Sequence, residues 1–260
     1  EYGISVETID GTGPNGRITA DDISTAAGKA PQPVAQSKPA TPVAVPAVTH
    51  PIAPSITAGA SAQIVPFNTL QAAVTRNMMA SLSVPTFRVG YTIETNNLDT
   101  LYKQIKSKGV TMTALLAKAV AITLAKHPIV NASYSEAGVN HPSSINIAVA
   151  VAMPDGGLIT PVLQNADQLD LYSLSRMWKD LVDRARIKQL QPQEYSSGTF
   201  TISNLGMLGV DRFDAILPAG TGAILAVGAS HPQVVASNDG TFAIRRQMQV
   251  NMTADHRIIY

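Results

Sequence analysis

The sequence contains no cysteine among its 260 residues. This absence excludes a disulfide framework, a cysteine nucleophile, a dithiol redox centre and a zinc or iron–sulfur site held by cysteines. Charged residues are also scarce, at 14% of the chain, where an ordinary soluble domain has about a quarter. Any thiol chemistry must therefore use thiols that the substrates bring.

Neither sign of charge dominates, and no apolar run is long. The 19 basic and 18 acidic residues give a net charge of +1, so no global field gathers nucleic acid or an anionic membrane. The longest apolar runs, such as residues 145–153, are far shorter than the roughly 20 residues that span a bilayer. The first residues show no secretory or transit pattern. We expect a soluble protein with no nucleic-acid or membrane partner.

Composition divides the chain into three parts. Residues 1–28 are too short to hold a core alone, since domains below about 40 residues usually need a staple. Residues 29–63 are rich in proline and alanine, which predicts a flexible linker. Residues 64–260 are long enough for one domain with a sizeable core.

The first part carries the signals of a small helical docking module. Gly11, Gly13 and Gly16 favour a tight loop. Thr19 followed by Asp22 predicts an N-cap and its reciprocal partner at the start of a short helix.

In the third part, strand and helix periods alternate. Alternating apolar residues and helical spacing predict these elements: strands at 87–93, 199–203, 223–228, 241–246 and 247–253, a hairpin over 145–163, and helices at 98–105, 112–127 and 174–185. Ser173 is expected to cap the last helix. On the hairpin, alternate alanines predict a small-residue face that packs closely. Because strands outnumber helices without a regular βαβ rhythm, we predict a mixed α/β sandwich rather than a Rossmann or TIM fold.

His256 is the strongest candidate for acid–base work near neutral pH. It lies between Asp255 and Arg257, and apolar runs flank this polar triplet, which is costly to bury without purpose. Spacing alone leaves a satisfied core histidine and a catalytic one equally open. Structural roles are expected for the other histidines, which lie in the linker or before prolines at the ends of elements: His50, His127, His141 and His231.

A second candidate is the strand that ends at Ser203. Alternation points Phe200 and Ile202 to one face and Ser203 to the other, and glycines turn the chain just beyond. A hydroxyl held there can donate a hydrogen bond to charge that develops during a reaction. Rows of hydroxyls on strands are also common for plain cross-strand hydrogen bonding. The sequence lacks a nucleophile elbow, a phosphate-binding loop, a dinucleotide fingerprint and a zinc-protease pair. These absences disfavour hydrolysis, nucleotide chemistry and metal catalysis.

Taken together, the two stretches resemble a known family. Residues 253–259 read TADHRII and residues 198–206 read GTFTISNLG, which is similar to the dihydrolipoamide acyltransferases at the cores of 2-oxo acid dehydrogenase complexes. That family shares its fold with chloramphenicol acetyltransferase. Residues 83–87 and 112–128 look closest to its plastid pyruvate dehydrogenase type, and residues 11–19 are similar to half of its peripheral subunit-binding domain.

The resemblance implies acetyl transfer between two thiols, with no enzyme nucleophile. His256 matches the family's base and Ser203 its oxyanion donor. The site is expected between subunits of a trimer, with coenzyme A entering from one side and the dihydrolipoyl arm from the other. Leu225 matches an apolar gate of this channel, although a core leucine explains it equally well, and Asn204 is expected to line the channel beside Ser203.

This sequence departs from the family at Tyr260, where the usual residue is Asp or Asn. A neutral tyrosine offers no charge to an arginine, so either Asp255 supplies that charge or the arginine turns toward solvent. Asp255, Arg257 and Tyr260 are expected to support the histidine. The family continues past this position, and its lipoyl domains and the first helix of its subunit-binding domain are also missing here. We therefore expect a truncated chain, with the lipoyl group on a domain outside it.

The resemblance also implies partners and location. Self-assembly into trimers and a larger core is expected, as are pyruvate dehydrogenase and dihydrolipoamide dehydrogenase components bound through residues 1–28. The chloroplast stroma is the expected compartment, with the mitochondrial matrix as the alternative. Two other functions stay open: an idle structural or tethering core subunit, which retention of His256 and Ser203 disfavours, and a serine hydrolase, which would need both residues in direct contact.

Overall fold

The computed structural model describes most of the chain, in these ranges: residues 9–10, 12–13, 17–26, 63–153, 157–237 and 239–260. The chain forms two compact units, residues 1–63 and residues 64–260. The predicted linker, residues 29–63, lies almost wholly outside the described residues, and so does His50.

In the first unit, the predicted helix is present as α1 (Ala20–Ala26). The Asp22 carboxylate accepts a hydrogen bond from the Thr19 amide at 2.7 Å, as the capping pattern predicted, and further bonds from the amide and hydroxyl of Thr12. These bonds, the Thr19 amide first, lower the pKa of Asp22. Of the predicted loop glycines, Gly13 donates to the Arg17 carbonyl at 2.9 Å, while the other two lie outside the described residues.

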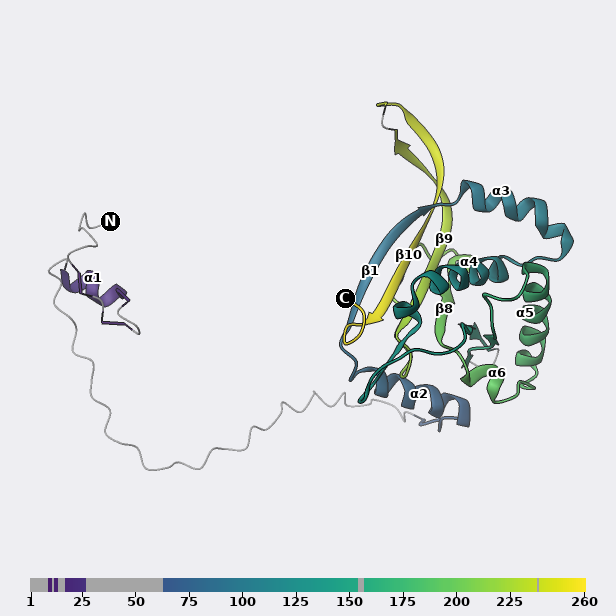
Figure 1. Cartoon of the computed structure of the whole chain (residues 1–260), viewed down its shortest axis with the longest axis horizontal. Helices are drawn as coiled ribbons and strands as arrows, with labels where there is room; N and C mark the ends of the chain where they lie inside the picture. The colour runs from purple at the N-terminus through teal and green to yellow at the C-terminus, as the bar shows by residue number, and fades with distance from the viewer. Residues whose placement is uncertain (1–8, 11, 14–16, 27–62, 154–156, 238) are drawn as a thin grey trace. The chain divides into compact units, whose positions relative to one another are not determined.

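The second unit is built on a six-stranded mixed sheet in the order β1-β10-β9-β8-β4-β7 (Figure 1). Its strands are β1 (Thr86–Glu94), β4 (Ile147–Val149), β7 (Val162–Leu163), β8 (Phe200–Asn204), β9 (Ala223–Ala236) and β10 (Phe242–Asp255). Strand β8 runs parallel to β4 and β9, and the remaining neighbours are antiparallel. The mixed α/β prediction is therefore confirmed.

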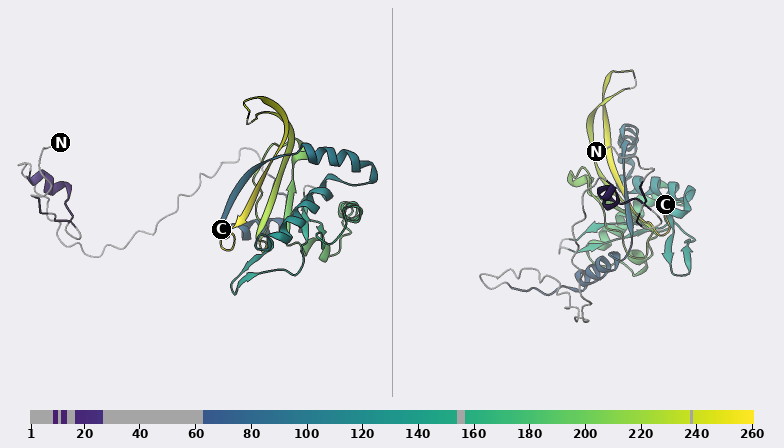
Figure 2. Two further views of the ribbon diagram at one scale, coloured as in Figure 1. Left: turned by 45° about the horizontal axis from the view of Figure 1, so that its top comes forward. Right: turned by 90° about the vertical axis from the view of Figure 1, so that its left-hand side faces the viewer.

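Strands β9 and β10 are longer than predicted and project beyond the rest of the unit (Figure 2). The two strands expected at 241–246 and 247–253 form one continuous strand with a register shift between Met248 and Val250. Pro232 does not end β9, because β8 stops pairing at Val227. Beyond that residue β9 is an edge strand, where a proline without an N–H is tolerated.

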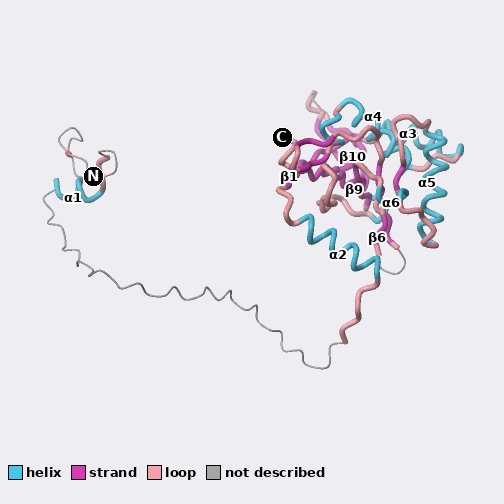
Figure 3. Tube along the Cα trace, turned by 60° about the horizontal axis from the view of Figure 1, so that its bottom comes forward, coloured by secondary structure: helices cyan, strands magenta, loops and turns pink. Residues whose placement is uncertain are grey.

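Helices flank the sheet. Their bounds are α2 (Thr69–Ser81), α3 (Asn96–Ile105), α4 (Met112–Lys126), α5 (Leu171–Arg186) and α6 (Gln193–Ser196), with short 3₁₀ turns η3 (Lys106–Lys108), η4 (Pro128–Asn131) and η5 (Gly206–Leu208). Buried residues of α4 and α5 join those of β4, β8, β9 and β10 in the main core, while α2 passes beside β6 (Leu158–Ile159) (Figure 3). Within the described ranges, no helix has both the length and the hydrophobicity that crossing a bilayer requires.

Helix α5 begins at a different cap from the one predicted. Asp170 is the N-cap, because its carboxylate accepts from the amides of Tyr172 and Ser173. Ser173 lies inside the first turn and donates its hydroxyl to Asp170 at 2.6 Å. One carboxylate oxygen of Asp170 accepts both free amides, and the other accepts the Ser173 hydroxyl, so the aspartate satisfies the start of the helix.

The predicted hairpin is present but divided between two sheets. Strands β4 and β7 pair within the main sheet, whereas β5 (Val151–Ala152) and β6 form a separate pair. Ala148 is buried, and a Cβ at Gly198 would lie 2.8 Å from its methyl group. Close packing of the small-residue face is thus confirmed at this position.

The apolar face of the edge strand β1 is only partly covered. Phe87 packs against the main core, but Val89, Tyr91 and Ile93, which alternate with it along one face, are exposed at 48%, 72% and 38%. A row of exposed large apolar side chains is typical of a surface that another subunit covers.

Candidate active site

Strand β10 leads into a tight turn that carries His256. The Asp255 amide donates to the Gly222 carbonyl at 2.9 Å, and the His256 amide donates to the Pro85 carbonyl at 2.9 Å. The Ile259 amide returns to the Asp255 carbonyl at 3.0 Å and closes the turn. These bonds tie the turn to the start of β1 and to the loop before β9.

The imidazole of His256 is held in one tautomer. Its Nδ1 lies 2.9 Å from the carbonyl oxygen of Ile259, and a carbonyl can only accept a hydrogen bond. In the neutral ring Nδ1 therefore carries the proton and Nε2 carries the lone pair. The ring is exposed and lies between Phe87 and Tyr260, with centroid distances of 4.7 and 5.9 Å. This arrangement suits a general base acting through Nε2.

Asp255 and Arg257 form the charge pair that the sequence placed beside the histidine. The carboxylate of Asp255 is 1% exposed and accepts from Nε of Arg257 at 2.9 Å and from Nη2 at 2.6 Å. Burial acts to raise the pKa of Asp255, but the hydrogen bonds from Arg257 outweigh it and the pKa is lowered. The same bonds raise the pKa of Arg257. Both groups are therefore charged at neutral pH.

Tyr260 takes no part in this charge pair. Its side chain is exposed, and its hydroxyl donates to the Arg257 carbonyl at 3.0 Å. Tyr134, which no sequence pattern singled out, instead covers the guanidinium of Arg257, with Cζ 3.8 Å from the ring centroid. Contacts between residues so far apart in the chain leave no periodic signal that could reveal them.

Ser203 lies near the end of β8, as alternation predicted. Phe200 and Ile202 are buried in the main core, while Ser203 is half-buried on the other side of the strand. The side-chain oxygen of Asn204 accepts from the Gly206 amide at 2.9 Å, which fixes the turn that follows. A hydroxyl on a braced strand end is held with little freedom.

A cavity of about 390 Å³ opens beside Ser203. Its walls are mostly apolar and come from α4, α5, the β5–β6 hairpin and η5: Thr113, Val149, Ala150, Val151, Ala152, Leu158, Trp178, Val182, Arg186, Asn204, Leu205, Met207 and Leu208. Asn204 also lines a neighbouring cavity of about 170 Å³ that shares Thr113 and Met207. The structure therefore places Asn204 between two cavities, beside Ser203.

One chain does not bring Ser203 and His256 together. In the sheet register Ser203 faces Ala226, which faces Asn251. His256 follows Asn251 by five positions, just past the end of β10, which places it ~16 Å further along the strand direction and two strand spacings of ~4.8 Å across. Along the strand direction, the candidate base therefore lies beyond the start of β8, and the candidate oxyanion donor lies near its end.

Leu225 lies between these two residues along the strand direction. It pairs with Ile202 of β8 and with Met252 of β10. It is half-buried and packs against the main core, so its geometry fits both a core leucine and a wall of a channel.

The remaining described histidines lie away from these residues. His127 ends α4, where its amide donates to the Thr123 and Leu124 carbonyls, and His141 is exposed in a loop. His231 does not end an element as predicted; it lies within β9 and pairs with Asp211 at 3.1 Å. The edge position of this part of β9 explains the difference.

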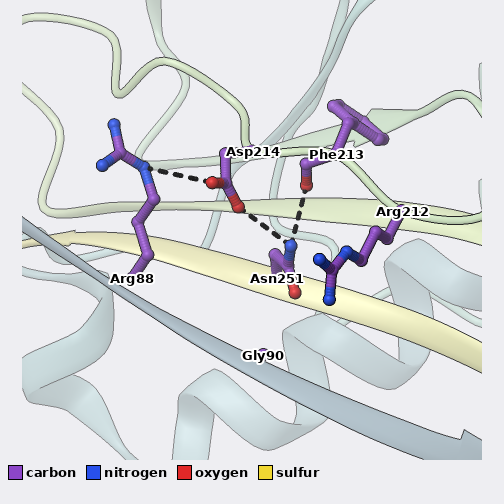
Figure 4. A pocket seen from close by; sticks show the side chains of 6 residues that line it. All are labelled: Arg88, Gly90, Arg212, Phe213, Asp214 and Asn251. Atoms are coloured by element: carbon purple, nitrogen blue, oxygen red, sulfur yellow. Dashed lines mark hydrogen bonds and ion pairs between the residues drawn. The ribbon is translucent and has the colours of Figure 1, made fainter.

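A polar cleft of about 330 Å³ lies over β1 and β10 (Figure 4). Asn251 donates its amide to the carboxylate of Asp214 at 2.9 Å and to the Phe213 carbonyl at 3.1 Å. Arg88 lies 3.7 Å from the other oxygen of Asp214. These contacts hold the 211–214 loop against the sheet.

Two family models match the chain. The 2-oxoacid dehydrogenases acyltransferase catalytic domain matches residues 59–260, and the E3 binding domain matches residues 1–24.

Similar proteins come from plastids and bacteria. The chain is 62% and 59% identical to components 5 and 4, respectively, of the chloroplastic dihydrolipoyllysine-residue acetyltransferase of the Arabidopsis thaliana pyruvate dehydrogenase complex. Both alignments cover 100% of this chain, but only 53% and 54% of those relatives. The chain thus spans about half the length of the curated relatives it matches.

Solved structures agree with the fold. One is the Azotobacter vinelandii dihydrolipoamide acetyltransferase, whose structure was studied for the role of a serine, a histidine and an asparagine in catalysis. It matches with a TM-score of 0.71 and 30% identity, and the match covers 76% of this chain and 85% of that one. A probable dihydrolipoamide acetyltransferase from Listeria monocytogenes matches with a TM-score of 0.73 and 26% identity over 78% and 89%.

Proposed function

Because the chain belongs to the 2-oxoacid dehydrogenase acyltransferase family, we propose that it transfers an acetyl group between a dihydrolipoyl arm and coenzyme A. The observation that carries the proposal is the anchored ring of His256, whose Nδ1 is engaged by Ile259. That bond leaves Nε2 free to accept a proton from the attacking thiol. The absence of cysteine agrees with direct transfer between two substrate thiols.

The reaction proceeds through proton transfer and attack. Nε2 of His256 takes the proton of the attacking thiol, and the resulting sulfur attacks the carbonyl carbon of the acetyl thioester. The tetrahedral intermediate carries its negative charge on oxygen, where the hydroxyl of Ser203 donates a hydrogen bond. Collapse breaks the original carbon–sulfur bond, and the leaving sulfur takes the proton back from His256. Asp255 and Arg257 support the turn without touching the reacting atoms.

The proposed site is shared between two copies of the chain in a trimer. Ser203 and His256 lie far apart along the strand direction of one sheet, so each needs a partner from a second copy. The exposed apolar face of β1 begins at Val89, three positions beyond the residue that pairs with Asp255, and supports such an assembly. In this arrangement Leu225 and Asn204 line the channel that admits coenzyme A and the lipoyl arm from its two sides.

The proposed biological setting is a plastid pyruvate dehydrogenase complex. Its support is the similarity to chloroplastic relatives, and the mitochondrial matrix is the alternative. Residues 1–28 form part of a subunit-binding domain, residues 29–63 a linker and residues 64–260 the catalytic core. The partners are further copies of this chain and the complex's pyruvate dehydrogenase and dihydrolipoamide dehydrogenase components, while a separate domain carries the lipoyl group.

Acetyl transfer from acetyl-coenzyme A to dihydrolipoamide by the full-length protein tests this function. We expect turnover that depends on the thiol acceptor. An idle core subunit would assemble without turnover. A serine hydrolase would cleave simple esters without the thiol, and either result would contradict the proposal.

A further inference from the structure

The guanidinium of Arg257 is held on two sides by groups from different parts of the chain. The buried carboxylate of Asp255 binds its edge at 2.6 and 2.9 Å. The ring of Tyr134 covers its face at 3.8 Å, a distance well within the range of cation–π attraction. The carboxylate therefore fixes where the guanidinium edge points, and the tyrosine ring fixes the orientation of the guanidinium plane.

Tyr134 comes from a hairpin outside the main sheet. Strands β2 (Ser133–Ser135) and β3 (Gly138–Asn140) form a separate two-stranded pair (Figure 2). A Cβ at Gly222 would lie 2.0 Å from the carbonyl oxygen of Ala132, and the Gly222 carbonyl accepts from the amide of Asp255. The base of the hairpin thus lies directly against the backbone that starts the histidine turn.

The side chain and backbone of Arg257 connect this hairpin to His256. The amide of Arg257 donates to Asp255 at 3.0 Å, and its carbonyl accepts from Tyr260. A rotation of the Arg257 side chain would release the carboxylate of Asp255 and loosen the turn. The Ile259 carbonyl that orients the imidazole belongs to the same turn.

We propose that Tyr134 is a positioning residue for His256, acting through the guanidinium of Arg257. The expected effect on turnover rests on the proposed function. The effect on the imidazole itself can be measured without catalysis.

The test compares Tyr134→Leu, which removes the ring, with Tyr134→Phe, which keeps it. Tyr172→Leu is the matched control, because both tyrosines are 40% exposed and Tyr172 lies on α5. In the assembled protein we expect Tyr134→Leu to lower kcat about ten- to a hundredfold, the usual cost of a misplaced catalytic group. KM for coenzyme A should stay near that of the wild type, and Tyr134→Phe should restore most of kcat. If Tyr134→Leu fails to assemble, Tyr134→Thr replaces it, because threonine also favours strands and lacks the ring.

A second measurement follows the rate at which diethyl pyrocarbonate modifies His256, read by peptide mass spectrometry. We expect this rate to change in Tyr134→Leu but not in Tyr134→Phe or Tyr172→Leu. The positioning role is overturned if kcat and the modification rate of Tyr134→Leu equal those of Tyr172→Leu, or if Tyr134→Phe is as impaired as Tyr134→Leu. A wild-type protein without acetyl transfer would contradict the proposed function alone, since the modification rates would still decide the role of Tyr134.

Discussion

At the scale of single residues, the proposed chemistry depends on two side chains with different surroundings. Ser203 is half-buried on a strand end beside an apolar cavity, whereas His256 is exposed on a turn with one nitrogen bound to Ile259. The serine can therefore lose its hydroxyl without disturbing the fold, and the histidine can lose its ring without opening the core.

Ser203→Ala should lower turnover by about 10² to 10³, the usual cost of one oxyanion donor, while the assembly stays intact. Acetyl transfer kinetics with the purified variant measure the loss. Ser107→Ala, an exposed serine in η3, is the control and should match the wild type. Near-normal turnover of Ser203→Ala would remove this residue from the mechanism.

His256→Ala should lower turnover by about 10² to 10⁴, as expected for a positioned general base. Binding of coenzyme A, measured by calorimetry, should be largely kept, because Nε2 acts on the thiol proton and not on the rest of the substrate. If binding and turnover fell together, the histidine would have a structural role instead.

Asp255→Asn should impair turnover more than Tyr260→Phe. The asparagine loses the charge that holds Arg257 in a buried setting, whereas the phenylalanine loses one exposed neutral hydrogen bond, worth within about 1.5 kcal/mol. A comparison of kcat for both variants, each assembled like the wild type, checks the ranking. The reverse order would show that Tyr260 orients the site.

The same pair gives a pH dependence with a defined sign. The pKa of Asp255 in the folded protein is below its ordinary value of 3.8, so its stabilisation is complete above that value and is lost as the pH falls below it. The difference in melting temperature between wild type and Asp255→Asn should therefore be constant near neutral pH and shrink in acid. A difference that grew in acid would contradict the depressed pKa.

At the scale of elements, close backbone approaches hold the histidine turn, the β2–β3 hairpin and the loop before β9 together. Gly222 lies where these three meet. The Ala132 carbonyl leaves no room for a side chain at this position, and the Gly222 carbonyl accepts from the amide of Asp255. Backbone atoms cannot move aside as a side-chain end can, so such positions resist substitution.

Gly222→Ala should lower the free energy of unfolding by about 1 to 3 kcal/mol, the usual cost of overpacking, and should lower kcat as the turn shifts. Gly90→Ala is the matched control, since its new Cβ would meet only the amide end of the Asn251 side chain, at 2.7 Å. Denaturant unfolding and kinetics measure both variants. Equal losses in the two would argue against a rigid contact at Gly222.

At the scale of the whole molecule, the separation of Ser203 from His256 decides the smallest active unit. The sheet register keeps them apart in one chain, and the exposed apolar face of β1 supports an interface with another copy. A homotrimer with shared sites satisfies both observations.

Mixing Ser203→Ala chains with His256→Ala chains tests the shared site. A mixed trimer can contain one intact site, because the normal serine of one copy meets the normal histidine of the next. We expect activity to return on co-assembly, with native mass spectrometry to verify the mixing. Mixed trimers without activity would show that each site uses one chain alone.

The sequence by itself determined most local elements and singled out the residues that we propose for the chemistry. Periodicity located α3, α4, α5 and β8, because amphipathic spacing follows directly from burial on one face. The signal that singled out His256, a polar triplet between apolar runs, is also local in the sequence. The sequence-based prediction was wrong at the cap of α5, where a neighbouring carboxylate accepts the free amides. It was also wrong at Pro232, because the end of β8 leaves that part of β9 at an edge.

Only the tertiary structure decided which distant residues meet. Strand order and register placed Ser203 and His256 far apart along the strand direction, and the β2–β3 hairpin brought Tyr134 onto Arg257. Such contacts depend on how elements cross in space and have no fixed spacing along the chain. The sequence alone therefore predicted His256 as the base and Ser203 as the oxyanion donor, and the fold fixed the geometry in which they would act.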